Sequence, residues 1–216
     1  MRRFATLALA LAAAAPAAAQ LSPHLRSAFD GPQGFLLTKA EKAAWEKVAS
    51  DEEAERFLAL FWARRDPDLA TPENEFRQDF EQRVAAANKL FSYAGIRGAL
   101  SARGKVLILL GMCDKRMDLE AGGKRGQDRF ERFGPRGYAY VESGAVQIWE
   151  YQPHRFPSLK AREPIHVVFR ERNPNAGDFE LLIEKRVNMQ TLRLLEEAPE
   201  GFIRHPDLTE PPTVSR

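Results

Sequence analysis

The sequence predicts an α+β domain in which about three N-terminal helices pack on a mainly antiparallel sheet of four to five strands. Two observations lead to this prediction. Apolar residues between positions 38 and 91 recur at helical spacing, whereas after Gly104 the period changes to short apolar or alternating runs separated by turn residues. A block of helices followed by hairpins is typical of α+β domains rather than of alternating α/β folds.

The first two helices are predicted from their start signals. Thr38 and Glu41 fit a capping box, in which each satisfies a free N–H group of the other, and this helix would run to about residue 49. Ser50 and Glu53 repeat the pattern at the start of a second helix. The second helix should end before Pro67, because the residue that precedes a proline is disfavoured in the α conformation.

A third helix is expected to begin at Thr71 and Pro72, as N-cap and first helical residue. Gly95 and Gly98 interrupt the helical pattern, so the helix is expected to end before them. One face of this helix is apolar through residues that recur three or four positions apart, namely Phe76, Phe80, Val84, Ala87 and Phe91.

The second half of the chain is predicted to form strands. Residues 105–110 (KVLILL) are a continuous apolar run between glycines, which indicates a buried strand, and residues 111–136 show no convincing period. Residues 138–141 and 145–151 flank Ser143-Gly144 and predict a first hairpin.

A second hairpin is expected where residues 165–170 and 179–183 alternate between apolar and polar side chains on either side of an NPNAG turn. A short helix near 189–195 follows. The sequence therefore divides into a leader at 20–34, a single domain at 35–198 and a Pro-rich, loosely ordered tail at 199–216.

The first 19 residues are typical of a secretory signal. Two arginines precede the apolar stretch from Phe4 to Ala15, and three alanines end at Ala19, so cleavage is expected between Ala19 and Gln20. The apolar core is shorter than the roughly 20 residues that a membrane-spanning helix needs. We therefore expect a periplasmic or secreted protein with no transmembrane span after signal removal.

Charge and cysteine content exclude some classes of function. The chain has 32 Lys and Arg against 30 Asp and Glu, and loss of the two signal arginines would leave 30 of each. Because nucleic-acid binders normally carry a basic surplus or stripe, we expect no nucleic-acid partner. The single cysteine, Cys113, forms no intrachain disulfide and follows a very apolar run, so it is expected to be buried.

No motif of established chemistry is present. The chain has no G-x-S-x-G sequence, and its four histidines have no ligand partner at metal-binding spacing. We therefore expect no catalytic residue, no metal and no cofactor. The alternative is a hydrolase or carbohydrate-active enzyme of an unrecognised type, with candidate residues Asp66, Glu75, Asp79 and His154.

The candidate binding residues are Trp62, Arg64, Arg65 and Asp66, at the end of the second predicted helix. Cations suit the last turn of a helix, where they interact with its dipole. In one interpretation the arginines recognise a carboxylate or the C-terminus of a partner. In the other, which we favour, they form a helix corner that an internal salt bridge stabilises.

At these residues the chain resembles the GWxTD domain family of exported bacterial proteins. The naming motif would fall at residues 98–102, where Ala99 and Ala102 stand for its Trp and Asp, and Ser101 for its Thr. The matching segments, which together span about Phe35 to Ile183, are FLLTKAEKAAWEKVASDEEAERFLALFWARRDP, TPENEFRQDFEQRVAAANKLF, RGKVLILLG, QIWEY and GDFELL.

The resemblance implies an exported α+β domain and lends no catalytic residues, because the family has no established reaction. We therefore expect a non-enzymatic binding or adaptor module of the bacterial cell envelope, whose partner is an envelope protein or polymer. A degenerate domain retained for a structural role is a further alternative, suggested by Ala99 and Ala102.

Overall fold

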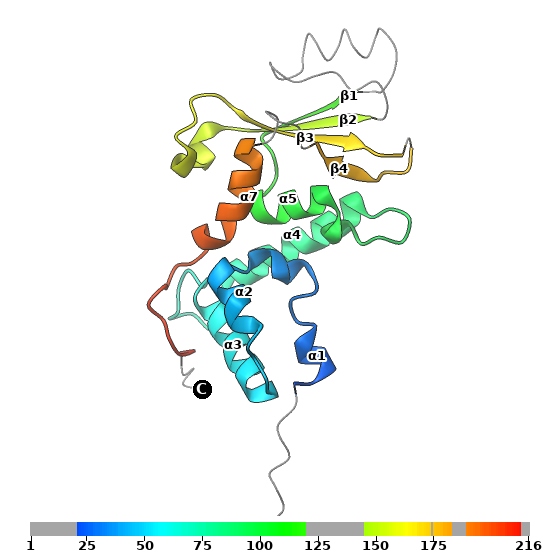
Figure 1. Ribbon diagram of the computed structural model, residues 1–216. Helices are drawn as coiled ribbons and strands as arrows, with labels where there is room; N and C mark the ends of the chain where they lie inside the picture. Colours follow the sequence, from blue (N-terminus) through cyan, green and yellow to red (C-terminus); the bar gives the residue numbers. More distant parts are fainter. Residues whose placement is uncertain (1–20, 120–144, 174, 183–188, 213–216) are drawn as a thin grey trace, which may run out of the picture.

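The computed structural model describes residues 21–119, 145–173, 175–182 and 189–212. It confirms the α+β class, with mostly N-terminal helices and a four-stranded antiparallel sheet (Figure 1). The helices are α1 (Pro23–Arg26), α2 (Lys39–Trp45), α3 (Asp51–Ala63), α4 (Glu75–Phe91), α5 (Ala102–Leu110) and α7 (Met189–Gly201). The strands are β1 (Lys115–Leu119), β2 (Val146–Tyr151), β3 (Ile165–Glu171) and β4 (Phe179–Leu181).

The predicted capping signals start α2 and α3. Thr38 Oγ1 accepts a hydrogen bond from Glu41 N at 3.1 Å, and Glu41 Oε2 accepts one from Thr38 N at 3.0 Å, so the capping box is complete. At α3, Ser50 Oγ accepts from Glu53 N. The Glu53 carboxylate, however, accepts from Ala49 N rather than from the N-cap residue itself.

The third helix starts later than predicted. Asn74, rather than Thr71, is the N-cap of α4, and its Oδ1 accepts from Arg77 N at 2.8 Å. The same amide donates from Nδ2 to Trp62 O at 2.9 Å, which ties the start of α4 to the end of α3. The Thr71 hydroxyl instead lies 2.9 Å from the loop carbonyl of Asp68 and 3.0 Å from that of Glu73, so its one proton serves one of them or is shared. The start of α4 is therefore set by Asn74, whose side chain bonds to both α3 and α4.

The apolar run at 105–110 is not a strand, which corrects the prediction. It forms most of α5. The N-cap of this helix is Ser101, whose Oγ accepts from Gly104 N at 3.0 Å, and its C-cap is Gly111, with φ 76°. Every residue from Val106 to Leu110 is buried. A helix that is buried on all sides shows no 3.6-residue period, so the sequence pattern resembles that of a central strand.

The N-cap of α5 gives a testable prediction. Replacement of Ser101 by alanine should lower the free energy of unfolding by about 1 kcal/mol, because Gly104 N loses its acceptor. Ser101→Thr keeps the hydroxyl and should lose less. Urea unfolding followed by circular dichroism measures both variants, and equal losses would show that the cap does not stabilise this helix.

The sheet has the order β1-β2-β3-β4, and every neighbouring pair is antiparallel. The predicted hairpin between 165–170 and 179–183 is present as β3 and β4, with Phe169 opposite Leu181. β2 forms where predicted, but residues 138–141 of the first predicted hairpin lie outside the described part of the chain. The neighbours of β2 among the described strands are β1 and β3, and β1 lies in the segment for which no period was found.

The main core lies between the sheet and the helices (Figure 1). Trp149 of β2 is 1% exposed and contacts the rings of Phe91 and Phe169, with centroid distances of 5.6 and 4.9 Å. Arg103 of α5 lies over Phe91 and Phe179, which packs α5 against the β3–β4 hairpin. A smaller apolar cluster that does not join the main core comprises Leu119, Val146, Ile148, Val168 and Leu182.

Both the leader and the C-terminal part of the domain contain more helix than the sequence predicted. The leader contains α1, and its Phe29 contacts the rings of Trp45, Phe57 and Phe61. At the other end, α7 continues through Pro199 to Gly201, beyond the short helix predicted. The predicted signal and its cleavage site at Ala19 and Gln20 lie outside the described residues. Among the residues described, no helix has the length and apolar character to cross a membrane.

Candidate functional site

The corner after α3 contains a buried ion pair. Arg65 is completely buried, and its guanidinium makes two hydrogen bonds to the Glu41 carboxylate, at 2.9 and 2.7 Å. It also donates to the carbonyls of Phe61 and Leu36 and lies 3.8 Å from the centre of the Phe61 ring. Arg65 is therefore a structural residue that links α2 to α3, and no partner can reach it without breaking this pair.

The neighbouring residues at this corner bind the chain's own C-terminal segment. Arg64 Nε donates to Leu208 O at 2.9 Å, and Arg64 O accepts from the backbone N–H groups of Arg204 and His205. His205 Nε2 lies 2.9 Å from Asp66 O. The residues placed in a loosely ordered tail thus dock on the α3 corner, and Arg64 and Asp66 are engaged within the chain.

The candidate enzyme residues have local partners. Burial raises the pKa of the Asp66 carboxyl, which accepts from Asp68 N. Glu75 Oε1 lies 3.3 Å from the Thr71 hydroxyl oxygen, and Asp79 pairs with Arg83 at 2.5 Å.

His154 lies exposed on a 3-10 turn after β2. Of the four enzyme candidates (Asp66, Glu75, Asp79, His154), none lines the groove or the cavity described below. Within the described residues, no group of His, Cys, Asp and Glu is arranged to hold a metal ion.

Two of the predicted site residues line hollows. Arg64 lines one of about 350 Å³ between α2, α3 and the C-terminal segment, and Trp62 lines another. Its half-buried ring contacts Phe61 and Phe80, with centroid distances of 5.0 and 5.6 Å, and Arg77 lies 5.2 Å from its centre. This side of the ring lines a hollow of about 540 Å³ between α1, α3 and α4. The remaining residues that line it are His24, Leu25, Ala28, Gln33, Leu58 and Ala59.

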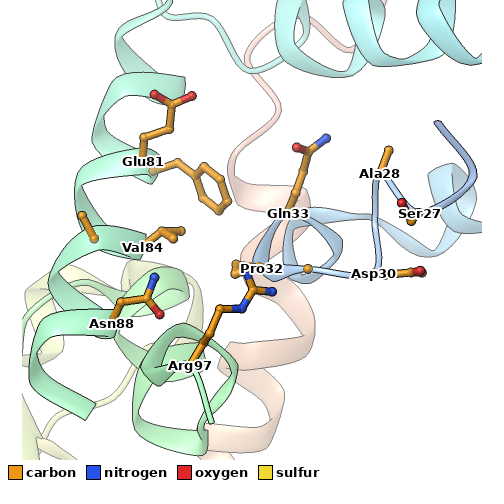
Figure 2. Close-up of a pocket in the computed structure, with 12 residues that line it drawn as sticks. Ser27, Ala28, Asp30, Pro32, Gln33, Glu81, Val84, Asn88 and Arg97 are labelled. Atoms are coloured by element: carbon orange, nitrogen blue, oxygen red, sulfur yellow. The ribbon is translucent and has the colours of Figure 1, made fainter. Parts of the chain in front are cut away.

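A second hollow of about 670 Å³ continues along α4 (Figure 2). In Figure 2, Glu81, Val84 and Asn88 lie along the helix on one side, and the segment that follows α1 forms the other side. Ala28 and Gln33 line both hollows. We refer to the two together as the α4 groove, and its described extent on the helix runs from Arg77 to Asn88.

Polar groups of the α4 groove lie where a ligand could meet them. Arg97 reaches up from the turn after α4 toward Pro32 (Figure 2), and its guanidinium makes no hydrogen bond or ion pair with the residues described. Asn88 Oδ1 accepts from Ala99 N at 2.9 Å, which fixes the amide and leaves its Nδ2 group for a ligand. At the other end Arg77 pairs with Glu81 at 3.0 Å.

Of the residues that line the α4 groove, the sequence analysis singled out Trp62 but not Gln33, Asn88 or Arg97. The available signal was weak: Asn88 and Glu81 share the helical face next to the apolar one, and Arg97 follows the helix by six residues. Only the fold brings these residues opposite the leader segment.

Cys113, which was expected to be buried, is half-buried in the structure, and this burial raises the pKa of its thiol.

The α4 groove offers both apolar and polar groups to a ligand. Besides its apolar floor, the groove is lined by the amides of Gln33 and Asn88, the guanidinium groups of Arg77 and Arg97, the carboxylates of Asp30 and Glu81, the Ser27 hydroxyl and the His24 imidazole. Comparison of the chain with family models, curated proteins and solved structures gave no match in any of the three.

Proposed function

We propose that this chain is a non-enzymatic binding module that holds an extended segment of a partner protein in the α4 groove. The observation that carries the proposal is the unpaired guanidinium of Arg97 at one end of a groove whose floor includes Trp62 and Phe80. An apolar floor with a few placed polar groups is typical of specific recognition sites.

The dimensions suit a short peptide segment. From Arg77 to Asn88 the helix rises about 17 Å at ~1.5 Å per residue. An extended chain advances about 3.3 Å per residue, so roughly five residues of a partner would lie along the groove. The apolar side chains of that segment would cover Val84 and the exposed Ala85.

The polar groups of the groove indicate the orientation in which a partner segment would bind. The amides of Gln33 and Asn88 can bond to peptide N–H and C=O groups, since a carboxamide both donates and accepts. Arg97 would bind a carboxylate through a two-point, charge-assisted contact. The partner therefore presents an acidic side chain or its own C-terminus at the Arg97 end. The sequence alone suggests this role for Arg64 and Arg65, but the fold engages Arg64 with Leu208 O and Arg65 with Glu41.

Export and family membership are part of the proposal. Residues 1–19 have the layout of a secretory signal, and the matching segments resemble the GWxTD family. The α+β fold agrees with what that resemblance implies. We propose that the protein works in the periplasm or outside the cell and that its partner is an envelope protein.

Substitution inside the groove should abolish binding. Ala85 is exposed and lines the groove, so Ala85→Trp fills it without disturbing the core. We expect a partner that co-purifies with the tagged full chain to be lost with Ala85→Trp and to be weakened about tenfold with Arg97→Gln. Quantitative affinity capture from cross-linked cells measures both.

The matched control is Leu90→Trp, which adds the same ring to an exposed position of the same helix outside the groove. It should retain the partner. A partner that all three variants retain would contradict the groove assignment, and the absence of any stoichiometric partner would contradict the adaptor function.

A further inference from the structure

A separate cavity of about 460 Å³ is lined by residues of α7, the end of α5 and the loop that follows β2. Its walls are mostly apolar. The apolar side chains that line it are those of Leu109, Leu110, Phe156, Pro157, Leu194, Ala198 and Phe202. This volume is within the range of about 300–1,000 Å³ that small-molecule sites occupy.

Hydrogen bonds hold the walls in place. Arg155 donates to Leu110 O at 2.9 Å and to Met112 O at 2.6 Å, which attaches the loop after β2 to the end of α5. Tyr151 donates to Gly111 O at 3.0 Å, and its ring contacts Phe156. These contacts hold the loop after β2 against the end of α5, so two sides of the cavity are preformed.

Of the charged side chains that line the cavity, Arg155 and Glu197 have partners within the protein and Arg204 has none among the described residues. Arg155 is engaged with backbone carbonyls and with Asp114, and Glu197 pairs with Arg193 at 2.6 Å. Arg204 also lines the cavity, and its guanidinium has no hydrogen bond or ion pair with the described residues. Its backbone is nevertheless held, because Arg204 N donates to Arg64 O at 2.8 Å.

We infer that this cavity binds a single-chain amphiphile with an anionic carboxylate head, of the fatty-acid class. The alkyl chain occupies the apolar interior, where its burial is favourable, and the carboxylate pairs with Arg204 at the mouth. The volume suits one short chain rather than the two chains of a phospholipid. The inference is independent of the α4 groove, because the two sites share no lining residue.

Calorimetric titration of the full chain with octanoate, decanoate and dodecanoate, each below its critical micelle concentration, tests the inference. We expect affinity to rise about fourfold for each added methylene group until the cavity is full. Decanol, which has the same chain without the charge, should bind about tenfold more weakly than decanoate. Arg204→Gln should remove this difference.

Two substitutions test whether the alkyl chain of the ligand binds inside this cavity. Ala198→Phe places a ring in the cavity and should abolish decanoate binding, whereas Arg56→Gln removes an exposed, remote arginine and should change nothing. If Ala198→Phe fails to fold, Gly201→Leu replaces it, since no atom lies within 4 Å of a Cβ added there.

Binding without chain-length dependence, binding that survives the filled cavity, or no binding of decanoate would each overturn the inference. Co-sedimentation with phosphatidylglycerol vesicles in the absence of decanoate binding would also overturn it, because it would assign the ligand to a lipid surface.

Discussion

Replacement of Gly104 by alanine should destabilise this protein by about 3 kcal/mol or more, although alanine is the better helix former by ~1 kcal/mol. A Cβ at this position would lie 1.9 Å from Gly98 O and 2.9 Å from Ala99 Cα. Both neighbours are backbone atoms, so a rotamer change cannot relieve the overlap. The same carbonyl accepts hydrogen bonds from Ser101, including one from its hydroxyl at 2.7 Å. We therefore expect the start of α5 to move or unfold.

The matched control is Gly201→Ala at the end of α7, where an added Cβ has no neighbour within 4 Å. This variant should be neutral or up to about 1 kcal/mol more stable. Thermal unfolding by circular dichroism compares the two, and Gly104→Ala should lower Tm by roughly 10 °C. Equal Tm values for Gly104→Ala and the unmodified chain would show that α5 does not pack against residues 98–99 as described.

The second large effect is expected at the buried ion pair. Arg65→Met should cost about 3–5 kcal/mol, because the Glu41 carboxylate stays buried without its partner. The double variant Arg65→Met with Glu41→Gln should lose less than the sum of the two single variants, since it removes both charges. Urea unfolding of the four proteins measures the coupling. Arg56→Met, at an exposed pair, is the control and should cost less than ~1 kcal/mol.

The same pair gives a pH dependence of defined sign. Burial alone raises the pKa of the Glu41 carboxyl, but the bonds from Arg65 and Thr38 outweigh it and hold the pKa below its usual range. A lowered pKa in the folded state stabilises the protein above the unfolded-state pKa, and this stability is lost as the pH falls through the folded-state value. The stability difference between the unmodified chain and Glu41→Gln should therefore narrow in acid. A constant difference from neutral pH to acid would contradict this account.

Local rules predicted the parts of the fold that local contacts determine. The capping box at Thr38 and Glu41 and the β3–β4 hairpin were both predicted, because their hydrogen bonds join residues close in sequence. The start of α4 was misplaced, because Asn74 is selected by a contact with Trp62, twelve residues away. The apolar run of α5 was assigned to a strand because complete burial removes the helical period.

The candidate site could be predicted only in part. The sequence drew attention to the turn after α3, and Trp62 does face the α4 groove. It did not show that Arg65 would pair with Glu41, a residue already assigned to a helix cap 24 positions earlier. Arg97 and Gln33 come together across the groove only because the leader segment folds back on α4, and no local pattern encodes that contact.

The most direct test of the account is site-specific photo-crosslinking in cells from position 85 in the α4 groove. A photoreactive residue there should give a specific adduct with a protein partner, and mass spectrometry should map the adduct to an acidic or C-terminal segment. The same residue at position 90, which is also exposed on α4 but lies outside the groove, should not form that adduct. The same adduct from both positions, or an adduct only from position 90, would contradict a binding site in the groove.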